Sequence, residues 1–99
     1  MDIQKSRNGG ELTVTLSGRL DTTTAPALET ELRGCVDAGV EKLIMDFTGI
    51  GYVSSAGLRV ILAAQKQMSR QGEMTLRGVC DEVMEVFEMT GFTDILTFE

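Results

Sequence analysis

Histidine is absent from this chain of 99 residues, and cysteine, proline and tyrosine are scarce. Because no histidine is present, a serine or cysteine hydrolase would lack the base that usually takes the proton of its nucleophile. The two cysteines, Cys35 and Cys80, lie far apart and form no C-x-x-C motif, whereas a structural zinc site needs about four Cys or His ligands. We therefore expect no metal and no cofactor, and two reduced thiols packed in the fold.

Long apolar runs and basic charge are also lacking. No run approaches the roughly 18 apolar residues that span a bilayer, and the N-terminal segment MDIQKSRNGGE has no signal-peptide pattern. We therefore expect a cytoplasmic protein that does not enter a membrane. Nine Lys and Arg against 15 Asp and Glu give a net charge of −6, which disfavours nucleic acids and anionic membranes as partners. A basic protein partner is compatible with this charge, although acidity is also a common way to stay soluble.

The hydrophobic pattern predicts alternating strands and helices in one domain, since a chain of this length buries one core. A tight turn at 7–11, where Asn-Gly favours a hairpin, separates a short first strand from an alternating strand over 11–18. The apolar run KLIMDF (42–47) predicts a central strand buried on both faces. Shorter strands are expected over 73–78 and 94–98.

Apolar residues at helical spacing predict helices over 21–39, 54–71 and 81–91. We expect the cap of the first helix within 22–24, with Pro26 in its first turn, and Gly72 and Gly91 just past the ends of the other two helices. Strands that alternate with helices predict an α/β fold. The expected architecture is a mixed sheet of about five strands with the helices packed mainly on one face.

The segment GIGYVSSAGLRVIL (49–62) carries the functional signal and allows three interpretations. Gly49 to Ser54 is similar to the dinucleotide motif G-x-G-x-x-G, with serine in the third place, but the acid expected at the end of the next strand is missing, since Arg77 and Gly78 end it. A nucleophile elbow around Ser55 would lack its leading glycine and a base, since Lys66 lies about 16 Å further along the helix.

The third interpretation is a helix start that presents a serine. Ser54 is expected to cap the helix through its hydroxyl, and Ser55 would be the first helical residue and point outward. A phosphate on Ser55 would meet the free N–H groups and the positive end of the helix dipole. Gly57 in the first turn costs up to about 1 kcal/mol relative to alanine. Either a partner approaches the helix closely there, or Gly57 fits a tight contact with the preceding loop.

Three stretches together resemble the STAS domain family, specifically the bacterial anti-sigma factor antagonists. They are LSGRLDTTTAPALETEL, LIMDFTGIGYVSSAGLRVIL and VFEMTGFTDIL, in the family's order and spacing. The resemblance covers essentially the whole chain and implies one non-enzymatic STAS domain over 1–99. It further implies binding to an anti-sigma factor that is a serine kinase with a histidine-kinase-like ATPase fold. Unphosphorylated antagonist would free the sigma factor, phosphorylation would reverse this, and a PP2C-type phosphatase would restore the active form.

By this resemblance Ser55 corresponds to the serine that is phosphorylated in the family, and Asp21 corresponds to the family's acidic residue after the second strand. Ser54 stands where the family has Asp, and Ala56 replaces its second serine, so Ser54 is a second candidate acceptor. Two residues are added by position: Thr22 beside Asp21, and Arg59 one turn beyond Ser55 on the same helix face. The predicted partner-binding residues are Asp21, Thr22, Ser54, Ser55, Gly57, Leu58 and Arg59. Alternative functions are a stand-alone STAS module of a stress-signalling or transport complex and a small nucleotide-binding protein. We expect a monomer, with weak dimerisation left open.

Overall fold

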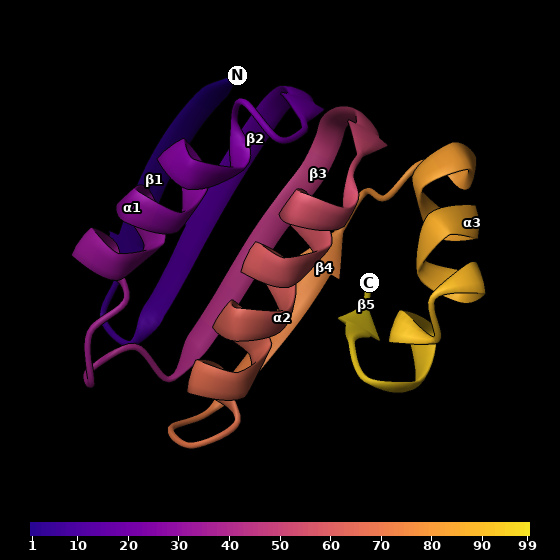
Figure 1. Ribbon diagram of the computed structural model, residues 1–99. Helices are drawn as coiled ribbons and strands as arrows, with labels where there is room; N and C mark the ends of the chain where they lie inside the picture. The colour runs from indigo at the N-terminus through magenta and orange to yellow at the C-terminus, as the bar shows by residue number, and fades with distance from the viewer.

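A five-stranded sheet with strand order β1-β2-β3-β4-β5 forms the framework of the molecule (Figure 1). The computed structural model describes residues 1–99. β1 pairs antiparallel with β2, and each later strand pairs parallel with its predecessor. The strands are β1 (Asp2–Asn8), β2 (Glu11–Leu20), β3 (Lys42–Val53), β4 (Glu73–Arg77) and β5 (Thr97–Phe98).

All three helices pack on one face of the sheet, as expected from right-handed connections that advance one strand at a time. α1 and α2 lie side by side in front of the sheet, and α3 lies toward the β4–β5 edge (Figure 1). The ring of Phe87 anchors α3, with its centroid 6.4 Å from that of Phe47 on β3 and 5.6 Å from that of Phe98 on β5. The helices are α1 (Ala25–Cys35), α2 (Ser55–Met68) and α3 (Asp81–Met89), followed by the 3-10 turn η1 (Phe92–Asp94).

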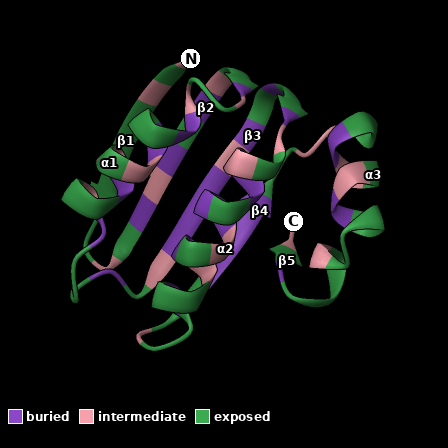
Figure 2. Cartoon of the chain, in the orientation of Figure 1, coloured by how far each residue is buried: buried purple, intermediate pink, exposed green.

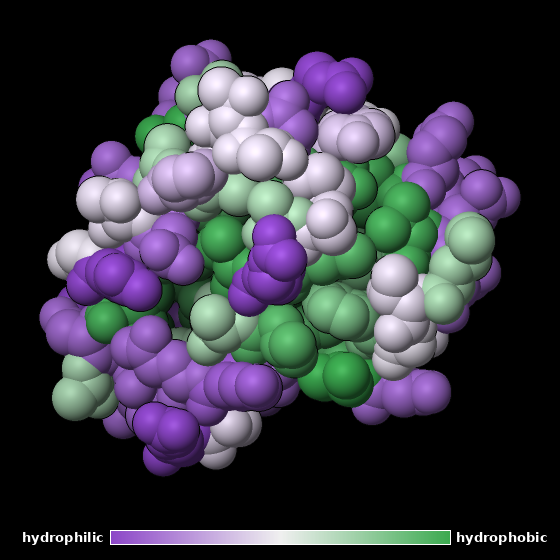
Figure 3. Space-filling view, viewed as in Figure 1, coloured by the Kyte–Doolittle hydropathy of each residue, from purple (hydrophilic) through white to green (hydrophobic).

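The core lies between this face of the sheet and the helices, where buried positions meet (Figure 2). Alternate residues of β2 and β3 point into it, because successive strand residues face opposite sides. Space-filling shows apolar side chains gathered between α2 and α3, and hydrophilic ones along the outer edge of α3 (Figure 3). Core residues from the sheet and first two helices include Leu12, Val14, Leu16, Leu28, Leu32, Leu43, Met45, Phe47, Leu58 and Ile61.

The mixed five-stranded sheet is confirmed, while several element boundaries were wrong. β3 runs on to Val53, so the glycine-rich segment is mostly strand and not loop. α1 covers 25–35 rather than 21–39, because Val36 has an extended backbone and ends it. α2 ends at Met68, and β5 is only two residues long.

Glycines explain the ends of these elements in different ways. The hairpin turn is built from Gly9, with φ 63°, and Gly10, whereas Asn8 is still in β1 and does not have positive φ. Gly91 has φ 78° just after α3, as expected. Gly72 has no positive φ, so its expected role as a left-handed helix terminator was wrong. The backbone of Glu41 lies so close to Gly72 that a Cβ would collide with it.

Two glycine-to-alanine substitutions test this packing. Gly72→Ala should destabilise the protein by about 1–3 kcal/mol, because backbone would have to move to admit a Cβ. Gly34→Ala, on α1 where no atom lies within 4 Å of an added Cβ, should stabilise it by up to about 1 kcal/mol. Urea denaturation measures both. Equal effects of the two substitutions would contradict the close approach at Gly72.

Candidate functional site

The carboxyl ends of β2 and β3 meet at one edge of the sheet, since the two strands are parallel. Leu20 and Val53 form their last pair. Immediately beyond it, the Ser54 N–H donates to the Leu20 carbonyl at 2.8 Å. This bond brings the turn that begins at Asp21 next to Ser54 at the start of α2.

The two serines at the start of α2 differ in what their hydroxyls do. Ser54 Oγ accepts from the Gly57 N–H at 3.4 Å, which confirms Ser54 as the cap of the helix. Ser54 is half-buried. Ser55 is exposed as the first helical residue, and its hydroxyl has no partner within the protein. Only the Ser55 hydroxyl is therefore both accessible and free.

Gly57 and Leu58 lie in the first turn of α2, and both are buried. A Cβ on Gly57 would lie 2.6 Å from Leu20 Cγ and 3.2 Å from the Leu20 carbonyl oxygen. The tight contact at Gly57 is thus made with the end of β2 and not with the loop before the helix. Without any partner bound, Gly57 and Leu58 therefore already pack the start of α2 against the sheet.

Asp21 directs its carboxylate into its own turn. Its Oδ1 accepts from the N–H groups of Thr23 at 3.0 Å and Thr24 at 3.1 Å, and from the Thr24 hydroxyl at 3.2 Å. The N–H of Thr24, more than any other group, lowers the pKa of Asp21 below its ordinary value, helped by Thr23 and by the charge of Arg19. Thr24 occupies the cap position of α1 but makes no capping bond with its side chain. The cap of α1 therefore lies within 22–24 as expected, but its hydroxyl makes no capping bond, because it donates its shortest bond to the Arg19 carbonyl at 2.7 Å and accepts from the Asp21 N–H at 2.9 Å.

Arg19 and Tyr52 form a pair at the same edge that the sequence analysis missed. The Arg19 guanidinium carbon lies 4.1 Å from the centre of the Tyr52 ring. Arg19 Nε also lies 3.6 Å from Asp21 Oδ2. The available signal was Tyr52 itself, the only tyrosine of the chain, two residues before the paired serines.

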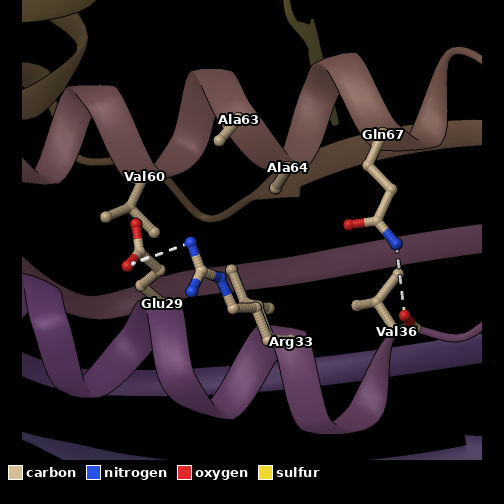
Figure 4. A pocket seen from close by; sticks show the side chains of 8 residues that line it. Glu29, Arg33, Val36, Val60, Ala63, Ala64 and Gln67 are labelled. Carbon is tan, nitrogen blue, oxygen red and sulfur yellow. Dashed lines mark hydrogen bonds and ion pairs between the residues drawn. The ribbon is translucent and has the colours of Figure 1, made fainter.

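A shallow groove separates α1 from α2 and begins beside the serines. At that end it is lined by Thr22, Ala25, Pro26, Glu29, Ala56, Arg59 and Val60. Farther along, Glu29 pairs with Arg33 at 3.5 Å and Gln67 Nε2 donates to the Val36 carbonyl at 3.2 Å (Figure 4). Arg59 is exposed and makes no ion pair with its own chain. Thr22 and Arg59 therefore flank the accessible start of this groove.

The glycine-rich segment does not form a phosphate-binding loop. Gly49 and Ile50 pair with Ser17 and Gly18 of β2. A Cβ on Gly49 would lie 2.8 Å from that of Ser17, so this glycine serves strand packing. No group of three or more His, Cys, Asp or Glu is arranged to hold a metal ion. None of the helices has the length and apolar character needed to cross a bilayer.

Comparison with known proteins assigns the family. The model of the STAS domain family matches residues 2–99. The chain belongs to the STAS domain family. BtrV of Bordetella bronchiseptica is 38% identical to this STAS chain over 96 residues, which are 96% of the chain and 83% of BtrV. The anti-sigma-B factor antagonist of Listeria monocytogenes is 34% identical over 94 residues, covering 93% of this chain and 82% of the relative.

A solved structure supports the same fold. The anti-sigma factor antagonist SpoIIAA in its unphosphorylated form matches this STAS chain with a TM-score of 0.82 at 16% identity. The match covers 99% of this chain and 88% of SpoIIAA. The family expected from the three sequence stretches is therefore confirmed.

The contact of Gly57 with Leu20 predicts a cost for a larger residue. Gly57→Ala should lower the free energy of unfolding by about 1–3 kcal/mol, because the buried Leu20 side chain has to yield. The control is Gly51→Ala, since an added Cβ there meets nothing within 4 Å. Urea denaturation compares the two, and an unchanged stability for Gly57→Ala would contradict the contact.

The lowered pKa of Asp21 predicts a specific pH dependence. An unfolded aspartate titrates near pH 4, so the stability contributed by ionised Asp21 is complete above about pH 4 and is lost as pH falls through its lower folded pKa. Asp21→Asn should therefore lower the melting temperature at neutral pH and reduce the further loss on acidification. Thermal melts across pH measure this. Asp94→Asn, at an exposed carboxylate without an ion pair, should keep the wild-type profile.

Proposed function

We propose that this STAS protein is an anti-sigma factor antagonist that phosphorylation of Ser55 switches off. The observation that carries the proposal is the division between the two serines: the Ser54 hydroxyl caps α2, whereas the Ser55 hydroxyl is exposed and unbonded. The name of the Listeria relative supports the antagonist role. The unphosphorylated chain binds an anti-sigma factor in the cytoplasm and thereby frees the sigma factor, which is regulatory binding and not catalysis.

The position of Ser55 explains how a phosphate acts without unfolding the carrier. A phosphoserine carries about −1.5 to −2 charges at neutral pH. At the first turn of α2 this charge is compatible with the helix dipole and the unpaired N–H groups. The phosphate changes the charge and shape of the docking edge while the core contacts of Gly57 and Leu58 remain. Partner release, rather than melting of α2, is the expected consequence.

The partner surface has an exposed part and a supporting part. Thr22, Ser55 and Arg59 are exposed and available for direct contact. Asp21, Ser54, Gly57 and Leu58 support this surface, because they order the turn, cap the helix and seat its first turn. The anti-sigma factor would be a serine kinase with a histidine-kinase-like ATPase fold, and a PP2C-type phosphatase would remove the phosphate.

The switch is tested by phosphorylation in vitro with such a kinase and ATP, followed by mapping of the phosphate by mass spectrometry. We expect phosphate on Ser55, none in Ser55→Ala, and retained phosphorylation in Ser54→Ala, because Ser54 is occupied as a cap. Ser55→Asp should weaken kinase binding, while Ser55→Ala should bind constitutively. Absence of phosphate from both serines would contradict a phosphorylation switch. Phosphate on Ser54 alone would contradict Ser55 as the acceptor and assign the switch to Ser54.

A further inference from the structure

Arg19 and Tyr52 are paired residues at the carboxyl ends of β2 and β3. Each precedes a buried residue, Leu20 or Val53, so each side chain faces away from the core. Arg19 is 65% exposed along its side chain, and Tyr52, at 42%, is one of three exposed large hydrophobic residues. An exposed aromatic ring with an arginine stacked on it therefore lies three residues before Ser55 in the chain, on the outward face of the same sheet edge.

The hydrogen-bonding capacity of the Arg19 side chain is unused within the chain, unlike that of Arg7 and Arg77. Arg7 binds Asp37 with two hydrogen bonds of 2.8 and 3.2 Å, and Arg77 binds Glu99 at 2.9 Å. The nearest carboxylate oxygen to Arg19 is 3.6 Å from its Nε, beyond hydrogen-bond length. The ring of Tyr52 and the charge of Asp21 thus orient the guanidinium, while its two terminal nitrogens have no acceptor.

We propose that Arg19, held by Tyr52, is an anchor that binds a carboxylate side chain of the anti-sigma factor next to Ser55. The inference rests on the proposed function, and it specifies which chemical group of the partner binds at one position of the partner surface. A guanidinium offers a planar fork of donors that matches both oxygens of a carboxylate. Stacking fixes the orientation before binding, which reduces the ordering cost of the contact. Arginine and tyrosine are also the residue types enriched at the energetic centres of interfaces.

The distribution of charge along the chain makes such an anchor selective. Residues 78–99 contain six Asp and Glu and no Lys or Arg, so this segment disfavours an acidic group on the partner. The Arg19 cation, oriented by Tyr52, then fixes the position at which that acidic group can dock, and orientations that bring it to residues 78–99 meet like charges. The anchor therefore sets the register of the complex around Ser55.

Charge reversal tests the anchor against a matched control. Arg70 is exposed, makes no ion pair and follows the other end of α2 from Ser55, about 22 Å along the helix axis. Arg19→Glu and Arg70→Glu change the net charge equally. Affinity for the recombinant anti-sigma factor that binds the wild-type chain is measured by calorimetry without ATP, with both variants in a Ser55→Ala background, so that neither serine becomes phosphorylated.

Arg19→Glu should weaken binding by at least about tenfold and Arg70→Glu by less than about threefold. Tyr52→Phe should keep wild-type affinity because the ring remains, whereas Tyr52→Leu should lose affinity about three- to tenfold. Replacing the contacted partner acid by arginine should restore binding to Arg19→Glu. Circular dichroism and melting temperature verify that each variant is folded. Since Tyr52 is the only tyrosine and tryptophan is absent, intrinsic fluorescence reports on the ring directly.

Equal losses for the two charge reversals would overturn the anchor, because a general electrostatic effect would then explain both. A loss for Arg19→Glu that occurs only with ATP bound to the partner would also overturn it, by assigning the guanidinium to a nucleotide phosphate. Failure of the wild-type chain to bind any anti-sigma factor is a different result: it overturns the proposed function and the anchor with it.

Discussion

The parallel pairing of β2 with β3 is the constraint on which the site depends. Parallel strands end at the same edge. The hydrogen bond from the Ser54 N–H to the Leu20 carbonyl adds one more link between the two segments, directly after the last strand pair. This bond fixes where α2 begins. Gly57 then allows the first turn of the helix to press on Leu20. The exposed hydroxyl of Ser55 and the turn of Asp21 are consequently positioned by one shared contact, although more than thirty residues separate them.

Irregular pairing within these strands determines which side chains reach that edge. Two register shifts occur along the β2–β3 pairing, so β3 accommodates two more residues than β2 before the pair Arg19–Tyr52. A single extra residue would turn the following side chains to the opposite face of the sheet, whereas two restore the original alternation. Leu20 and Val53 therefore both return to the core, and the arginine and the tyrosine face outward together. Bulges of this kind occur frequently beside functional sites because they redirect side chains.

The sequence predicted the order of the elements, the mixed sheet, the cap at Ser54 and the exposure of Ser55, because each depends on local patterns of polarity and on helix capping. It did not predict that β3 would extend to Val53. The polar and glycine residues of 48–52 oppose a strand on local grounds, and only pairing with β2 makes them one. The stack of Arg19 on Tyr52 was likewise missed, since it joins residues 33 positions apart through a register that bulges have altered. Asp21 does follow the second strand, as the sequence predicted, but its bonds to the turn that starts α1 become evident only when Thr23 and Thr24 are seen to donate to it.

The distribution of charge explains why a phosphate at this edge is an effective signal. Residues 78–99 contain six Asp and Glu and no Lys or Arg. The remaining residues, 1–77, contain nine acidic and nine basic side chains and therefore have no net charge. Ser55 belongs to this balanced part, whose arginines at 19 and 59 lie near the site. A phosphate of about −2 there changes the sign of a nearly neutral surface, and its influence extends over a Debye length of about 8 Å at physiological salt. On a uniformly acidic surface the same charge would alter the local potential proportionally less. The separation of the acidic C-terminal segment from the balanced remainder therefore increases the contrast between the two states that a partner meets at Ser55.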